Sequence, residues 1–125
     1  MKSALVLVLS IFMLDALACG VCIDDKVAAC YDHAVVTQAH AQGHEVAFFA
    51  VQGPLPANAE SKAKLEKALQ ATAGVLRGTG RVSVENGALS FAYDPKRTNA
   101  LVTAQRIEKR LAEPSLSLAL LRVMN

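Results

Sequence analysis

The sequence predicts an α+β fold in which two helices lie on one face of a four-stranded antiparallel sheet. Runs typical of strands and helices follow one another along residues 45–125 in the order β-α-β-β-α-β. Between the two central strand runs lies Asn86-Gly87, a pair typical of tight β-hairpin turns. This order is that of the split β-α-β, or ferredoxin-like, plait. One extra helix is expected before the plait, in residues 19–44.

A change from apolar to amphipathic pattern marks the first strand and helix of the plait. Glu45 to Val51 is rich in β-branched and aromatic residues and is followed by Gly53-Pro54, as expected of a strand closed by a loop. Asn58 or Ser61 can then cap a helix whose apolar residues recur at three- and four-residue spacing. Gly74 marks the expected end of this helix.

The second half of the plait is expected to contain a hairpin, a helix and a last strand. Both hairpin strands alternate apolar and polar residues, and a type I′ turn at Asn86-Gly87 would join them. The elements expected here are strands 81–85 and 89–93, a helix capped by Thr98 or Asn99 and ended by Pro114, and a strand over 116–123.

Residues 1–18 have the composition of a secretory signal peptide. The apolar run Ala4 to Leu14 is too short to span a membrane, and Ala16 and Ala18 supply small residues at a cleavage site before Cys19. A lipid anchor on Cys19 is an alternative, although the preceding Ala-Leu-Ala matches the usual lipoprotein pattern poorly. We therefore expect a periplasmic or secreted protein without a membrane span.

All the cysteines and histidines of the chain lie in residues 19–44. The six candidate metal ligands are Cys19, Cys22, Cys30, His33, His40 and His44. At roughly 100° per residue of helix, Cys22 and the three histidines fall within about 40° of one another, with Cys30 about 80° round. Thiolates and imidazoles are ligands that bind copper and zinc. The pattern therefore predicts a Cys/His stripe on one helix, beside an apolar packing face.

The length of a helix limits what this stripe can bind. A rise of about 1.5 Å per residue places Cys22 and Cys30 roughly 12 Å apart, too far to share one ion on a straight helix. The stripe instead offers three pairs of ligands, Cys19 with Cys22, Cys30 with His33, and His40 with His44. Further ligands would come from the N-terminal segment folding back, from a second copy in a homodimer, or from a metal donor or acceptor protein.

Two other functions remain open for the same residues. A Cys-x-x-Cys at a helix start is also typical of thiol–disulfide redox proteins, because the helix dipole stabilises a thiolate there. Alternatively, Cys19 and Cys22 form a structural disulfide, Cys30 is a buried thiol, and the plait is a protein-interaction module. The extra helix could cover the second sheet face or pair with the same helix of a second chain.

Composition argues against several other classes of protein. The net charge of +2 is too small to indicate nucleic-acid binding, and without Trp the chain has no aromatic platform for stacking bases. No His-Glu-x-x-His, Gly-x-Ser-x-Gly or phosphate-binding glycine loop is found in the sequence. We therefore expect a protein that is not an enzyme.

Three stretches of the plait resemble a known family. Gly74-Val75, the hairpin and Tyr93 to Thr98 are similar to parts of the heavy-metal-associated domain family, the small plaits of copper chaperones and metal-pumping ATPases. The resemblance covers Glu45 to Val123 and implies the same fold. In that family the metal-binding Cys-x-x-Cys lies between the first strand and first helix, but here residues 53–59 contain no ligand. The expected function is thus an exported protein that binds copper or zinc through its N-terminal Cys/His stripe.

Overall fold

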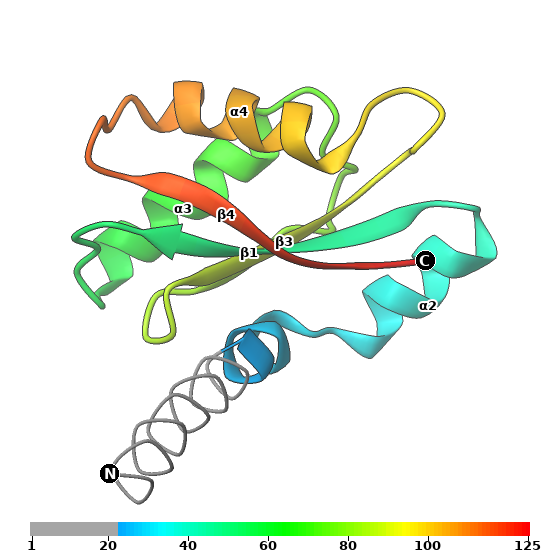
Figure 1. Cartoon of the computed structure of the whole chain (residues 1–125), viewed down its shortest axis with the longest axis horizontal. Helices are drawn as coiled ribbons and strands as arrows, with labels where there is room; N and C mark the ends of the chain where they lie inside the picture. Colours follow the sequence, from blue (N-terminus) through cyan, green and yellow to red (C-terminus); the bar gives the residue numbers. More distant parts are fainter. Residues whose placement is uncertain (1–22) are drawn as a thin grey trace, which may run out of the picture.

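The computed structural model describes residues 23–125, which form a four-stranded sheet with helices on both faces (Figure 1). Residues 23–30 are helical. The elements that follow are α2 His33–Ala41, β1 Glu45–Gln52, α3 Ala59–Ala71, β2 Arg81–Ser83, β3 Ala88–Tyr93, α4 Ala100–Leu111 and β4 Ser117–Met124. No helix within residues 23–125 combines the length and apolar character needed to cross a bilayer.

The sheet has the strand order β2-β3-β1-β4, and all neighbouring strands are antiparallel. In the central strand β1, Ala47 pairs with Phe91 of β3 and with Val123 of β4. A β-bulge interrupts the β1–β4 pairing between Phe48 and Phe49. Together with α3 and α4 on one face, this topology confirms the predicted α+β, ferredoxin-like plait.

The two plait helices begin where the sequence offers an asparagine. The side chains of Asn58 and Asn99 accept hydrogen bonds from Ser61 N and Val102 N, each at 2.8 Å. Both residues have extended backbone and so serve as N-caps, one of each pair of expected candidates. Helix α3, the first of the two plait helices, ends at Ala71, three residues before the expected Gly74, because Thr72 has an extended backbone conformation.

A first hydrophobic core lies between the sheet and the helices α3 and α4. Phe49 and Phe91 stack at its centre with ring centroids 5.5 Å apart, and both are fully buried. Leu65 and Leu69 of α3 and Ile107 of α4 pack into the same core.

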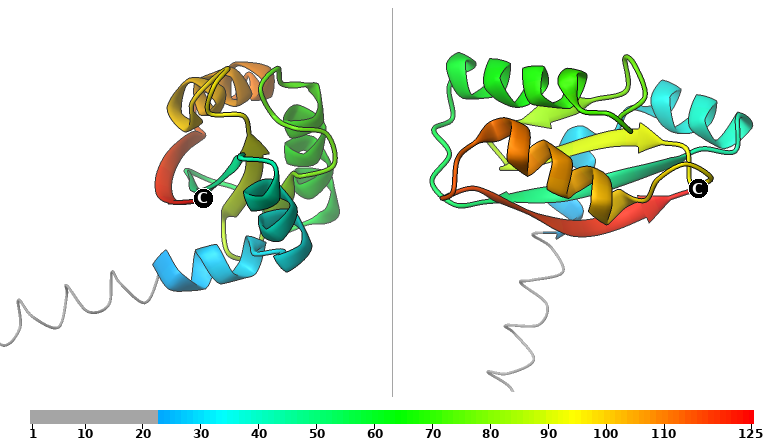
Figure 2. Two further views of the ribbon diagram at one scale, coloured as in Figure 1. Left: turned by 90° about the vertical axis from the view of Figure 1, so that its right-hand side faces the viewer. Right: turned by 90° about the horizontal axis from the view of Figure 1, so that it is seen from above.

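The second face of the sheet is covered by the N-terminal helices, as Figures 1 and 2 show. They contribute Val27, Cys30 and Ala39 to a second buried cluster. The sheet residues below them are Val46, Phe48, Ala88 and Ala92. This second core explains why β3 is buried along its whole length. Of the two roles expected for the N-terminal segment, covering the sheet is the one that the structure shows.

Residues 23–41, which cover the second face of the sheet and are called the cover below, form two helices. The prediction of one continuous helix was wrong. The helix over 23–30 ends before Tyr31, and α2 starts after its N-cap Asp32, whose side chain accepts from Ala34 N at 3.0 Å. A short polar side chain next to the backbone favours such a helix start. The predicted Cys/His stripe assumed one straight helix. Across the break, residues on either side no longer keep the spacing of 100° per residue, so the stripe is not continuous.

The hairpin between β2 and β3 is present, but its expected turn type was wrong. Ser83 pairs with Ala88, so residues 84–87 all lie in the turn. Among these residues only Gly87 has a positive φ, of 60°, whereas a type I′ turn needs two such residues. The Asn86 side chain instead donates to Ser83 Oγ at 3.0 Å. A longer turn with one left-handed glycine therefore joins the strands.

Candidate functional site

The structure separates the candidate metal ligands into different surroundings. Cys19 and Cys22 lie outside the described residues. Cys30 is at the end of the first described helix, His33 begins α2, His40 lies in the last turn of α2, and His44 follows it. Within residues 23–125, no group of three or more His, Cys, Asp or Glu side chains is placed to hold a metal ion.

Cys30 belongs to the core of the cover. Its side chain is buried between the N-terminal helices and the sheet, and its carbonyl accepts a hydrogen bond from Ser90 Oγ at 3.2 Å. Burial raises the pKa of the Cys30 thiol to about 11, although the main-chain N–H of Ser83 acts against the rise. A neutral buried thiol is a poor metal ligand, so the surroundings of Cys30 favour a packing role.

His33 is exposed and lies within a small polar group. Its Nδ1 is 3.2 Å from the Tyr31 hydroxyl, and its Nε2 is 3.4 Å from Thr37 Oγ1. Cys30 is buried in the core whereas His33 is exposed, so the two members of the expected Cys30/His33 pair lie in different surroundings.

The other two histidines lie at the far end of α2. His40 is exposed in the last turn of the helix. His44 comes after Gly43, which has a φ of 74°, and is half-buried. His44 lines a cavity of about 280 Å³ between α2 and the loop before β2, and this cavity contains no cysteine.

Hydrogen bonds from charged side chains link the cover to the sheet. Arg122 Nη2 of β4 donates to Asp24 Oδ1 at 3.0 Å, and Arg81 Nε of β2 donates to Asp32 Oδ2 at 3.0 Å. The ammonium group of Lys26 donates to the carbonyls of the hairpin turn. No local sequence pattern links residues so distant along the chain. A capping preference at Asp32 was the one available signal.

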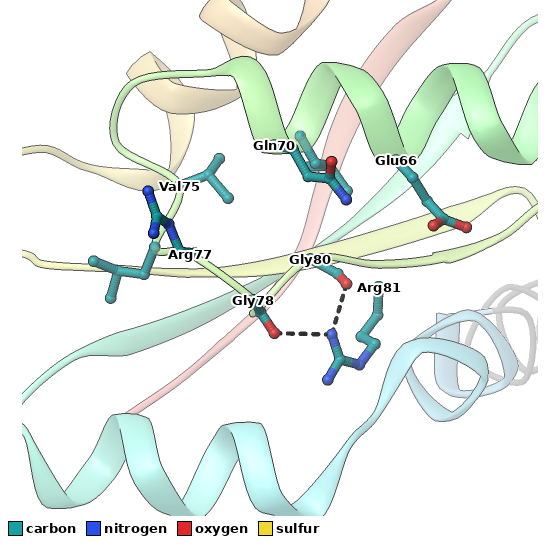
Figure 3. A pocket seen from close by; sticks show the side chains of 9 residues that line it. Glu66, Gln70, Val75, Arg77, Gly78, Gly80 and Arg81 are labelled. Carbon is teal, nitrogen blue, oxygen red and sulfur yellow. Dashed lines mark hydrogen bonds between the residues drawn. The ribbon is translucent and has the colours of Figure 1, made fainter.

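Arg81 also lines two cavities, and Figure 3 shows the first of them. The first has a volume of about 650 Å³ between α3 and the loop before β2, and the second, of about 350 Å³, reaches Cys30. Arg81 Nη1 donates to Gly78 O at 3.1 Å and Gly80 O at 2.8 Å, as Figure 3 shows. These bonds stabilise the loop. The guanidinium thus joins the loop to the start of α2.

The architecture of the plait is similar to that of a solved copper binding domain. A copper binding domain from HMA7, a P-type ATPase, is 18% identical with a TM-score of 0.51, over 63% of this chain and 96% of that domain. The likeness shows the fold. The N-terminal domain of the zinc(II) ATPase ZiaA, in its apo form, is 29% identical over 60% of this chain and 94% of that domain, with a TM-score of 0.45.

The sequence itself matches no family model, and a search of curated proteins finds no match either. In this chain the loop between β1 and α3 is Gly-Pro-Leu-Pro-Ala-Asn, without cysteine or histidine. All the cysteines and histidines of the chain lie in residues 19–44, outside this loop.

Proposed function

We propose that this chain is an exported, non-enzymatic protein that binds copper or zinc through Cys19 and Cys22. The observation that carries the proposal is the burial of Cys30, whose raised pKa leaves Cys19 and Cys22 as the cysteines available for thiolate formation. Two thiolates separated by two residues can ligate one ion, and thiolates favour Cu(I) and Zn²⁺. The shared fold with a copper binding domain adds support.

The histidines have secondary roles in this proposal. His33 is exposed but engaged by Tyr31 and Thr37, and His40 lies two helical turns further along α2. We assign neither of them, nor His44, to the primary pair of ligands. Cys30 is assigned to packing of the cover.

A competition titration tests the metal-binding proposal. Reduced protein is titrated with Cu(I) or Zn²⁺ against a coloured chelator, in wild type, a Cys19→Ser/Cys22→Ser variant and a Cys30→Ala variant. We expect the double variant to lose at least about tenfold in affinity, or roughly 1.4 kcal/mol. The Cys30→Ala control should keep the wild-type affinity.

Equal metal affinity in wild type and double variant would contradict the proposal. Thiol counting on the same samples then identifies the alternative, because a stable Cys19–Cys22 disulfide would favour the redox or structural interpretation.

Export needs a separate measurement. We expect the protein from its native host to begin at Cys19, because the small residues before it suit a signal peptidase. Intact-mass measurement checks this, and a retained Met1 would contradict it. A mass increase at Cys19 that matches acyl chains would instead support the lipid-anchored alternative.

A further inference from the structure

We propose that the turn between β2 and β3 is a site of spontaneous covalent modification, in which Asn86 is converted to isoaspartate with the help of the Lys26 ammonium group. The reaction is an attack of the main chain on its own side-chain amide, followed by hydrolysis, and its co-reactant is solvent water. The inference is independent of metal binding. It rests on the contact between Lys26 and one peptide unit of the turn.

The peptide unit between Asn86 and Gly87 lies outside the strand ladder. Ser83 pairs with Ala88, so the residues between them are free of the β2–β3 pairing. The Gly87 N–H donates to the Val84 carbonyl oxygen at 3.4 Å, which is long for such a bond. The Asn86 side chain is exposed, and its amide donates to Ser83 Oγ at 3.0 Å. Because glycine has no Cβ, its nitrogen is open to attack the neighbouring amide carbon.

Lys26 contacts the same peptide unit from the first described helix, which lies next to the turn (Figure 1). Its ammonium group donates to the carbonyl oxygen of Asn86 and lies 3.5 Å from that of Gly87. The Asn86 carbonyl and the Gly87 nitrogen belong to one conjugated peptide group. When this nitrogen loses its proton, negative charge spreads to the carbonyl oxygen, where the ammonium group stabilises it. Lys26 therefore favours the nucleophilic form of the Gly87 nitrogen.

The steps balance with hydroxide and water, and no atom is oxidised or reduced. Hydroxide removes the Gly87 N–H proton, and the nitrogen forms a bond to Asn86 Cγ. The bond from Cγ to Nδ2 breaks, and the amide nitrogen takes a proton from water and leaves as ammonia. A succinimide ring remains. Water then adds to one of the two ring carbonyl carbons, and the bond from that carbon to the Gly87 nitrogen breaks as the nitrogen regains a proton.

The position of Lys26 favours one of the two ring openings. Addition of water at Cγ gives aspartate with the original main chain, whereas addition at the main-chain carbonyl carbon of residue 86 gives isoaspartate. Lys26 donates to the oxygen of this second carbonyl and so polarises it. The carboxylate that is released there forms beside the ammonium group. The expected main product is therefore isoaspartate, paired with Lys26.

The product changes the contact between the cover and the plait. The chain then runs through Cβ and Cγ of residue 86, so the turn gains a methylene group in its main chain. Gly87 O, which accepts from Val51 N of β1 at 2.8 Å, has to adjust to this longer path. The hydrogen bond from Lys26 to a neutral carbonyl becomes an ion pair. A change in charge and in chain path thus accumulates at this contact as the protein ages.

Asn58 and Asn99 provide internal controls within the same chain. Each caps a helix, and their side-chain oxygens accept from Ser61 N and Val102 N, each at 2.8 Å. Each is followed by an alanine, whose Cβ shields the attacking nitrogen. Both should stay unmodified while Asn86 reacts.

Peptide mapping of the aged protein tests the proposal. Wild type, Lys26→Met and Lys26→Arg are incubated at mildly alkaline pH, digested, and analysed by mass spectrometry with electron-transfer fragmentation, which distinguishes isoaspartate from aspartate. We expect conversion at Asn86 to slow at least about threefold in Lys26→Met, because a charge-assisted hydrogen bond to the developing anion is lost. Lys26→Arg keeps the charge and should convert at nearly the wild-type rate. Lys109→Met removes an exposed lysine of α4 and should leave the rate unchanged.

The same measurement in urea separates the effect of the ammonium group from a change in flexibility. Unfolding removes Lys26 from the turn, so wild type and Lys26→Met should then convert equally fast. A folded Lys26→Met variant that converts as fast as wild type or faster would overturn the proposal, as would a difference that persists in urea. An unmodified Asn86 in aged wild type, or an isoaspartate share that does not fall in folded Lys26→Met, would overturn it as well.

Discussion

Gly87 has a backbone conformation that side-chain-bearing residues rarely adopt. Its φ is 60°, and a Cβ built there would lie 3.4 Å from the Val51 carbonyl oxygen. Asn86 has no positive φ. Substitution of Gly87 should therefore lower stability more than substitution of Asn86, although both residues belong to the Asn-Gly pair that predicted the turn.

Substitution of these two residues tests the observed turn. Gly87→Val should lower stability by about 1 kcal/mol or more, because a β-branched residue is strained at positive φ. Asn86→Val should cost about 0.5 kcal/mol or less, through loss of an exposed side-chain hydrogen bond. Thermal unfolding measures both. Equal large losses would support the type I′ turn instead.

The buried thiol of Cys30 makes stability depend on alkaline pH. The unfolded thiol releases its proton near its ordinary pKa of 9.0, whereas the folded thiol keeps it until about 11. The unfolded state thus binds fewer protons over this range, and stability falls as pH rises. Burial also raises the pKa of Tyr93 to about 12, which adds a further decline at higher pH.

We expect the free energy of unfolding to fall between about pH 9 and pH 11, and to fall less steeply in Cys30→Ala. Urea titrations at several pH values measure the slope, and Tyr93→Phe serves as a control for the phenol. Cys30 should also resist alkylation until the protein unfolds. Identical slopes in wild type and Cys30→Ala would argue against burial of this thiol.

At the scale of the elements, Asp32 determines where α2 begins. Its backbone is extended, its carboxylate accepts from Ala34 N and Val35 N, and Arg81 holds the pKa of this carboxyl below its ordinary value. One side chain therefore both caps a helix and links it to β2.

Two substitutions of Asp32 separate these roles. Asp32→Asn keeps a good cap but loses the charge, whereas Asp32→Ala loses both, so stability at pH 7 should fall in that order. A lowered carboxyl pKa stabilises the fold above the unfolded pKa, and the contribution is lost as pH falls through the folded pKa. The gap between wild type and Asp32→Asn should therefore close in acid. Urea unfolding at pH 7 and below pH 3 checks this, and a gap that persists in acid would contradict it.

At the scale of the whole molecule, the sheet is buried on both faces. The plait helices cover one face and the N-terminal helices cover the other, over a separate buried cluster. Phe48 illustrates the consequence, because it is 1% exposed only while the cover is in place. We therefore expect the cover and the plait to unfold together.

Val27→Ala tests this cooperativity. Val27 is buried under the cover, so the substitution should lower the free energy of unfolding by about 2 kcal/mol while leaving a single transition. Val102→Ala, at an exposed position, should change it by about 0.5 kcal/mol or less. Denaturation followed by far-ultraviolet circular dichroism measures both. A separate early transition would show that the cover unfolds independently.

The sequence alone determined the order of the plait elements, two candidates for each helix cap and the candidate ligands of the N-terminal segment. These features depend on residues within one or two turns of each other, which periodicity and capping preferences describe. Only the tertiary structure decided the break at Tyr31-Asp32, because the apolar period continues across it. It alone also decided the burial of Cys30 and the contacts Asp32–Arg81 and Asp24–Arg122, whose partners are 49 and 98 residues apart. Such pairs form because packing two layers onto one sheet brings distant side chains together, and no local pattern records them.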